Sequence, residues 1–305
     1  MRSYALDKAV TQRSLLADYL VLAKPGIVGL VLVSTLTGMY LGGAGGGAGG
    51  GGGAVLDMSL LFWTLAGVGL STAGACVLNN FLDRDIDSLM ERTSQRALPS
   101  GSIPPANALV AGTVLHALGL SILVTRVNLV TAALTFAAVI TYVVLYGMFL
   151  KRTTHHANQV GGIAGALPPL MGYAAVTGTL TVEALVLFAI VTLWQQPHAL
   201  SLALKYRDQY RGAGIPAVPV VKGVHSTKKK ILAYTAALVP ASFLPWALEM
   251  AGSLYLAAAL ASGAVYLGLG VRFLISRRDH SMFLFFYSVI YLTVLFTALV
   301  VDMRV

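Results

Sequence analysis

Residues 79–101 read NNFLDRDIDSLMERTSQRALPSG and directly follow an apolar segment. Ionisable groups beside a membrane helix are costly and are therefore functional candidates. Asn79, Asp83 and Asp87 are four residues apart, so on a helix they lie within about 80° of one another. Two carboxylates and an amide oxygen on one stripe suit Mg²⁺, which binds one or two carboxylates together with substrate phosphates. Asp85 points to the opposite side of the helix and is not expected to be a ligand.

The composition places the chain among membrane proteins. Its 305 residues are 57% hydrophobic and 11% charged, whereas a typical soluble domain is about 25% charged. The single cysteine, Cys76, excludes an intrachain disulfide and a multi-cysteine metal site. The net charge of +9 could indicate nucleic acid, but the sequence lacks a basic face interleaved with aromatic residues. We therefore expect the bilayer, and no nucleic acid, as the partner.

The apolar runs predict an all-α polytopic membrane protein with nine transmembrane helices. Each run approaches the roughly 20 residues that a bilayer requires. The first run is longer than a signal-peptide core, so we expect an uncleaved first helix. The expected spans are 19–41, 59–82, 106–125, 129–149, 159–178, 182–204, 230–249, 254–274 and 282–301.

The distribution of basic residues predicts the orientation. If the N-terminus is cytoplasmic, 19 of the 21 lysines and arginines fall on the cytoplasmic side, and only Arg126 and Arg304 fall outside. Such asymmetry predicts an N-in, C-out topology. Residues 1–305 are expected to form one domain, with residues 42–53 (GGAGGGAGGGGG) as a flexible outer loop. Segments 83–105 and 205–229 are expected to be cytoplasmic loops.

A second polar stripe is predicted at the inner end of the sixth span. His198, Ser201, Lys205 and Asp208 share an arc of about 80°, and Pro197 should kink the helix before them. We expect both polar stripes at a similar depth. Carboxylates with a metal, opposite fixed cations, are what a diphosphate requires as it leaves a substrate. Lys24, Arg92, Arg96, Lys151 and Arg152 supply further cations at the same face.

Simpler explanations exist for some of these residues. Charges at a span's cytoplasmic end commonly set topology and anchor lipid headgroups, and this applies to Arg152. His116, alone in the third span, is best explained by an interhelical hydrogen bond. His155 and His156 are expected to be solvated loop residues.

The motifs of the chain resemble the UbiA superfamily of intramembrane prenyltransferases. The resemblance covers Lys24-Pro25, NNFLDRDIDSLMERTSQRALPSG, LKRT from Leu150, GGIAGALPPLMGYAAVTG from Gly161, Gln196-Pro197-His198 and AGIPAVPVVKG from Ala213. The last three together point to the haem branch. Quinone-type members are expected to have a second Asp-rich motif on the sixth span, where this chain has His198 and Lys205 and retains only Asp208. The chain also has Lys24-Pro25-Gly26 and Arg96-Ala97-Leu98, where the family usually has Lys-Pro-Arg and Arg-Pro-Leu.

The resemblance implies a helical bundle around a central cavity that opens to lipid and is capped by the two cytoplasmic loops. It implies transfer of the farnesyl group of farnesyl diphosphate to a vinyl group of haem B, with addition of water, to give haem O. The expected location is a bacterial inner membrane with the site on the cytoplasmic side, and a downstream haem-modifying enzyme or oxidase assembly factor is a conceivable partner. Catalytic roles are expected for Asp83, Asp87, His198, Lys205 and Asp208; Mg²⁺ is expected on Asn79, Asp83, Asp87 and Asp208; and diphosphate is expected on Asn79, Asn80, Lys24, Arg92, Arg96, Lys151 and Arg152.

Two other functions remain open from the sequence. One is a prenyltransferase of the same kind that acts on a quinone-precursor or chlorophyll-type acceptor. The other is a cation-coupled transporter. Transporter sites usually lie near the bilayer midplane in broken helices, whereas the acids here lie at helix ends.

Overall fold

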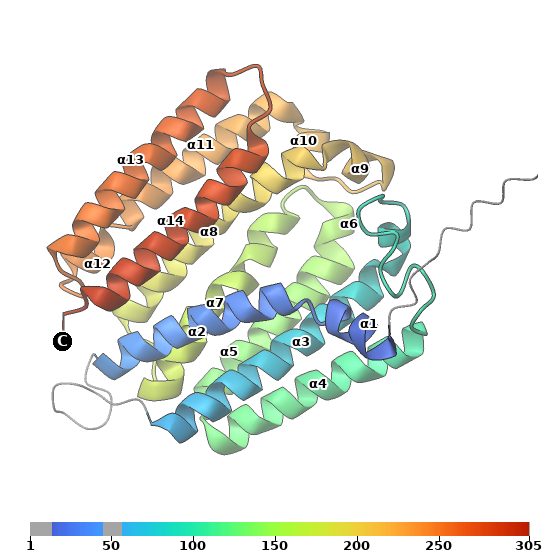
Figure 1. The fold of residues 1–305 in the computed structure, drawn as a ribbon, viewed down its shortest axis with the longest axis horizontal. Coiled ribbons are helices and arrows are strands. Elements are labelled where there is room, and N and C mark those ends of the chain that lie inside the picture. The colour runs from blue at the N-terminus through green and yellow to red at the C-terminus, as the bar shows by residue number, and fades with distance from the viewer. Residues whose placement is uncertain (1–13, 45–56, 305) are drawn as a thin grey trace, which may run out of the picture.

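The computed structural model describes residues 14–44 and 57–304, and these form a helical bundle without a strand. A lone β-bridge joins Ala251 to Met303. The helices are shown in Figure 1. In chain order they are α1 (Leu15–Leu22), α2 (Pro25–Ala44), α3 (Met58–Ser88), α4 (Pro105–Arg126), α5 (Leu129–Val139), the π-helix η1 (Ile140–Leu150), α6 (Lys151–Thr153), α7 (Ala157–Thr177), α8 (Val182–Lys205), α9 (Arg207–Gly212), α10 (Val218–Val221), α11 (Gly223–Ala241), α12 (Leu244–Ala247), α13 (Ser253–Ile275) and α14 (Ser281–Val301).

Eight helical segments of the described chain are long and apolar enough to cross a membrane. They correspond to eight of the nine expected spans. The remaining one, expected at 230–249, is divided between α11 and α12. Helix α11 begins earlier, at Gly223, and carries Lys228, Lys229 and Lys230, which lower its hydropathy. The helical membrane architecture is therefore confirmed, while the count of nine and the orientation stay predictions.

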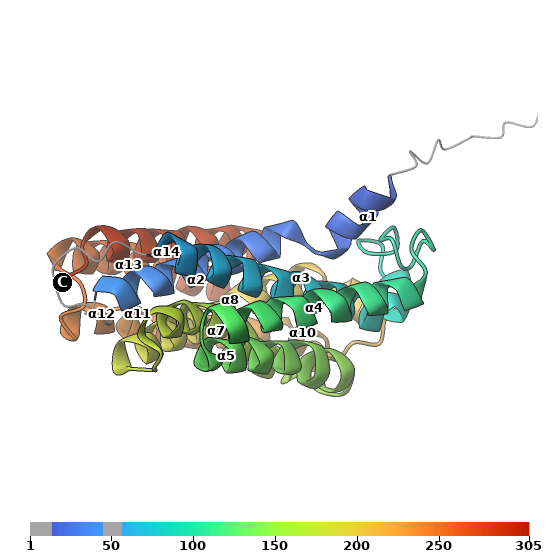
Figure 2. The same ribbon diagram turned by 90° about the horizontal axis from the view of Figure 1, so that it is seen from below.

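The long helices run side by side in two connected groups (Figure 1). In the first group, α3 packs along α4, and α2 along α7. In the second, α8, α11, α13 and α14 pack on one another, and α7 contacts α8 to join the groups. Turned by 90°, the bundle shows α13 and α14 on one side and α5 and α7 on the other (Figure 2).

Glycines allow α2 and α7 to approach closely. A Cβ atom on Gly38 would lie 1.9 Å from the Pro169 carbonyl oxygen, and one on Gly172 would lie 1.8 Å from that of Thr35. No side chain fits in that space, so the backbones touch directly, as small residues permit in membrane helix pairs. Helix α7 remains continuous through its internal prolines.

The charged connecting segments lie at one end of the bundle. Residues 89–104, α6, α9 and α10 lie at this end, opposite α12 and the C-terminus (Figure 1). The expected loops are partly helical: α3 continues to Ser88, so Asp83 and Asp87 are helical, and segment 205–229 contains α9, α10 and the start of α11. Residues 42–44 of the expected glycine-rich loop belong to α2, and residues 45–53 lie outside the described residues.

Candidate active site

The acidic stripe on α3 is buried and neutralised by two cations. Asp83 and Asp87 are 3% and 4% exposed, and α3 holds them in the register that the sequence predicts. The Lys151 ammonium lies 2.6 Å from Asp83 Oδ2, and the Arg96 guanidinium lies 2.7 Å from Asp87 Oδ2. Lys151 begins α6 and Arg96 belongs to the segment after α3. Three separate parts of the chain therefore meet at this stripe.

A third cation reaches the stripe at Asn79. Lys24 donates to Asn79 Oδ1 at 2.9 Å, and the Tyr142 hydroxyl donates to the same oxygen at 3.1 Å. Lys24 has a φ of 52°, in the left-handed region that non-glycine residues seldom occupy. Such strain persists where the surroundings enforce it, often at functional sites. Burial lowers the pKa of Lys24 to about 8, so its ammonium can lose its proton in mildly alkaline solution.

Asn80 has a positioning role beside the stripe. Its amide nitrogen donates to the Leu22 carbonyl at 2.8 Å and to the Cys76 carbonyl at 3.1 Å. Its oxygen accepts a hydrogen bond from Arg96 at 3.3 Å. Asn80 thereby ties the turn that carries Lys24 to α3, and it has no amide hydrogen of its own left for a diphosphate.

Two of the expected diphosphate ligands lie outside this group. Arg152, expected to bind the diphosphate, instead forms two hydrogen bonds of 2.7 Å with Asp85 on the exposed side of α3. Arg92 is exposed and lies over the Tyr206 ring, 5.0 Å from its centroid. Neither residue contacts Asp83 or Asp87.

The second polar stripe, on α8, does not face the first one. His198 forms a 2.7 Å hydrogen bond with Ser288 and stacks on Phe285, and both of these residues belong to α14. The arc of α8 that contains His198 is therefore turned toward α14. Lys205 is exposed and forms no ion pair with a described residue.

Asp208 is likewise not brought to the stripe. Its side chain is 76% exposed and pairs with Arg207 and Arg211 of its own helix, α9. Helix α9 directs Tyr210 inward instead, where it packs near Ile86 at the end of α3. Since residues two apart lie on roughly opposite sides of a helix, an inward Tyr210 requires an outward Asp208. The expectation that Asp208 helps to hold a metal at this site is not supported by the geometry.

Two cavities adjoin the stripe and show residues that the sequence did not reveal. A polar cavity of about 160 Å³ is lined by Tyr146, Lys151, Tyr210 and residues of α7 and α8, including Asn158. An apolar cavity of about 160 Å³ is lined by Tyr142, Cys76 and residues of α2, α5 and α7, including Pro168. Tyr142 and Tyr146 stack with ring centroids 5.9 Å apart. Both lie in η1, and π-helical turns are frequent at functional sites.

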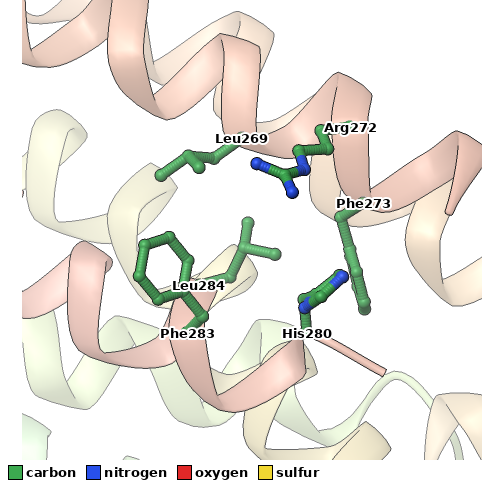
Figure 3. Close-up of a pocket in the computed structure, with 6 residues that line it drawn as sticks. All are labelled: Leu269, Arg272, Phe273, His280, Phe283 and Leu284. Atoms are coloured by element: carbon green, nitrogen blue, oxygen red, sulfur yellow. The ribbon is translucent and has the colours of Figure 1, made fainter. Parts of the chain in front are cut away.

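The remaining histidines have separate places. His116 shares a 2.7 Å hydrogen bond with Ser71 of α3, which confirms the expected interhelical bond. His155 lines the polar cavity beside His156, with which it is in contact. A further cavity between α13 and α14 contains His280 and Arg272 amid Leu269, Phe273, Phe283 and Leu284 (Figure 3). Its lining has no carboxylate, the usual protein ligand of a hard metal ion.

The stripe fits a divalent cation that is completed by a substrate. Asp83 Oδ1 and Asn79 Nδ2 are buried and have no hydrogen-bond partner in the described part of the chain. No group of three His, Cys, Asp or Glu side chains that could hold a metal occurs among residues 14–44 and 57–304. Asp83 and Asp87 would thus offer two carboxylates, and phosphate oxygens would supply other ligands, as is usual for Mg²⁺. The Asn79 oxygen is occupied, so its free amide hydrogens suit a phosphate oxygen better than a metal.

Comparisons with known proteins show which sequences this chain is similar to. Residues 31–296 match the sequence model of the UbiA prenyltransferase family. The chain is 46% identical to the protoheme IX farnesyltransferase of Aquifex aeolicus over 97% of this chain and 99% of the relative. It is 42% identical to that of Stutzerimonas stutzeri over 93% of each chain.

Solved structures share the fold. A structure of digeranylgeranylglyceryl phosphate synthase superposes with a TM-score of 0.76 at 19% identity, covering 95% of this chain and 99% of that one. A UbiA homolog from Archaeoglobus fulgidus bound to GPP and Mg²⁺ gives a TM-score of 0.61 at 17% identity, covering 92% and 99%.

Proposed function

The chain belongs to the UbiA prenyltransferase family, and we propose that it is a protoheme IX farnesyltransferase. In this reaction the farnesyl group of farnesyl diphosphate joins a vinyl group of haem B, and water adds to give haem O and diphosphate. Relatives of that name match the chain at 40–46% identity over nearly its whole length. The buried stripe of Asp83 and Asp87 with its three cations is the observation that carries the proposal.

The cations of the site bind the departing diphosphate. Lys151 and Arg96 exchange their carboxylate partners for phosphate oxygens, and Lys24 and the free amide of Asn79 add hydrogen bonds. Asp83 and Asp87 would hold a magnesium ion, which would supply positive charge to the leaving group. Fixed positive charges in a water-poor site stabilise the negative charge that develops as the allylic C–O bond breaks.

The two cavities accommodate the rest of the substrates. The apolar cavity beside Cys76 and Pro168 suits the isoprenoid chain, and the polar cavity beside Tyr210 lies where the acceptor can approach. The stacked rings of Tyr142 and Tyr146 lie at these cavities and present π-faces, which attract a cation such as the developing allyl group. Burial raises the pKa of Tyr210, so its phenol stays protonated and can donate a hydrogen bond.

The reaction takes place at one end of an integral membrane protein. We place this end on the cytoplasmic side of a bacterial inner membrane because basic residues concentrate there. Haem B and farnesyl diphosphate both partition into the bilayer, so lateral entry is feasible. A downstream haem-modifying enzyme or oxidase assembly factor remains a candidate recipient of the product.

The decisive experiment uses the purified full-length protein in lipid nanodiscs with farnesyl diphosphate, haem B and Mg²⁺. The expected product is haem heavier by one farnesyl group and one water, formed together with diphosphate. Farnesylation of a quinone precursor or a chlorophyll-type alcohol, but not of haem, would instead support another acceptor. Cation flux into sealed vesicles without diphosphate release would support the transporter and reject the enzyme.

A further inference from the structure

Helices α7 and α8, which pack on each other, carry buried amide side chains that lack partners. Gln159 Oε1, Gln195 Nε2 and Gln196 Oε1 are buried and have no hydrogen-bond partner among the described residues. Gln196 is 4% exposed, and among the described residues its side chain makes one hydrogen bond, a long one of 3.5 Å to the Asn158 carbonyl. Unpaired polar groups among membrane helices are costly. Three such groups on two contacting helices therefore point to a polar ligand.

Gln195 lies next to residues that line the two cavities of the candidate site. A Cβ atom on Gly165 would lie 2.7 Å from Gln195 Oε1 and 2.9 Å from Nε2, so this amide rests against a glycine that lines the apolar cavity. Ala199, one turn further along α8, lines the polar cavity. A Cβ atom on Gly162 would similarly lie 2.9 Å from Gln196 Nε2. The glycines of α7 therefore make the room that these amides occupy.

On the basis of the proposed function, we propose that Gln195, aided by Gln196, holds the water molecule that adds to the haem side chain. The terminal vinyl carbon forms a bond to C1 of the farnesyl group while the C–O bond to diphosphate breaks. The vinyl carbon next to the porphyrin is then a cation. The oxygen of the held water bonds to that carbon, and the proton that the water loses passes to the released diphosphate.

The chemistry of an amide suits this task. Its oxygen accepts a hydrogen bond from water and its NH₂ donates one, so two amides can fix the position of one water molecule. An amide is also a very weak base. A carboxylate or an imidazole in the same place would remove a proton from the cation and give an alkene. A haem propionate is a less suitable ligand, because an anion requires positive charge and these three amide side chains supply none.

The test is the partition of the product between haem O and its dehydrated form, which is lighter by one water. Purified variants in nanodiscs receive farnesyl diphosphate, haem B and Mg²⁺ in water enriched in heavy oxygen, and both products are measured by mass. Gln195→Met keeps the length of the side chain and removes the amide. We expect the ratio of haem O to dehydrated haem to fall about tenfold, the factor for one hydrogen bond of ordinary strength.

A second variant moves the amide without deleting it. Gly165→Ala places a methyl group against the Gln195 amide and should lower the same ratio. Thr64→Val is the matched control, because it also removes an unpaired buried polar atom but belongs to α3, whereas the amides belong to α7 and α8; it should leave the ratio unchanged.

An unchanged ratio in both Gln195→Met and Gly165→Ala, with haem O still formed, overturns the water-holding role alone. Proportional loss of both products also overturns it, because a structural defect or loss of propionate binding lowers total turnover without changing the partition. If the unaltered protein makes neither product, the proposed function itself fails.

Discussion

Replacement of Asp83 by asparagine tests the centre of the proposed site. The change keeps the shape of the side chain and removes the charge that pairs with Lys151 and the oxygen, Oδ1, that has no partner. Loss of one preorganised electrostatic contact at a leaving group typically lowers turnover about 10²–10³-fold, or roughly 2.7–4 kcal/mol. We expect a decrease of at least this size in kcat/KM for haem O formation, partly relieved by high Mg²⁺.

The fold should survive this substitution. A fully buried ion pair that loses one partner costs about 3–5 kcal/mol. Lys151 keeps 15% of its side-chain surface exposed, and its long stem lets the ammonium reach water, so the cost should be smaller. Thermal unfolding in detergent should show a modest decrease. Addition of Lys151→Gln to the variant should restore part of the stability, because no unpaired charge remains, but none of the activity.

Asp85→Asn is the matched control. Asp85 lies two residues away on the same helix and also loses an arginine contact, but its side chain is 61% exposed, and exposed pairs contribute about 0–1 kcal/mol. We expect almost normal haem O formation and stability from it. If Asp83→Asn forms haem O as fast as Asp85→Asn does at ordinary Mg²⁺, Asp83 does not hold the metal and the reasoning is refuted.

Three further predictions address other parts of the site and the fold. Because the Lys24 pKa is about 8, kcat/KM for farnesyl diphosphate should decline as the pH rises through about 8 and the ammonium is lost. Lys24→Arg should move this decline to higher pH. If the variant shows the decline at the same pH, the decline belongs to another group. His198→Ala should retain haem O formation per folded molecule, since His198 faces α14, and loss of product from a well-folded variant would contradict this. Gly172→Ala should lower the melting temperature in detergent strongly, since its Cβ would meet the Thr35 carbonyl at 1.8 Å, whereas Gly29→Ala, which has open space, should not; equal melting temperatures would count against the close contact of α2 and α7.

The sequence predicted those features that depend on one helix alone. Apolar runs located eight membrane helices, and the four-residue spacing placed Asn79, Asp83 and Asp87 on one face because α3 stays helical to Ser88. The arc expected on the sixth span was correct only in part, because α8 ends at Lys205 and Asp208 belongs to α9. A helical wheel shows which residues share a face but not which neighbour that face contacts, and here the neighbour is α14. The role of His198 opposite the acids therefore could not be excluded before the fold was known.

The sequence did not identify the aromatic residues of the site. Tyr142 and Tyr146 lie in a run that is apolar throughout, and tyrosine is common in membrane helices. Their shared place at the cavities depends on η1 and on the packing of η1 against α3 and α7. The partners of Lys24 were equally hidden, because its left-handed backbone directs the ammonium toward Asn79 across a separation of 55 residues in sequence.

The charge of the assembled site distinguishes the functions that the sequence left open. Lys24, Arg96 and Lys151 lie within hydrogen-bond distance of the stripe, against the two carboxylates of Asp83 and Asp87. The site is thus net positive below the Lys24 pKa of about 8. A free cation would be repelled by the three positive groups, so a carrier for cations is a poor fit. A diphosphate brings excess negative charge even when it arrives with a divalent metal, and it can accept hydrogen bonds from all three cations while the carboxylates turn to the metal. The same arrangement explains why the acids can remain buried before substrate binds: the groups that will hold the diphosphate neutralise them in the meantime.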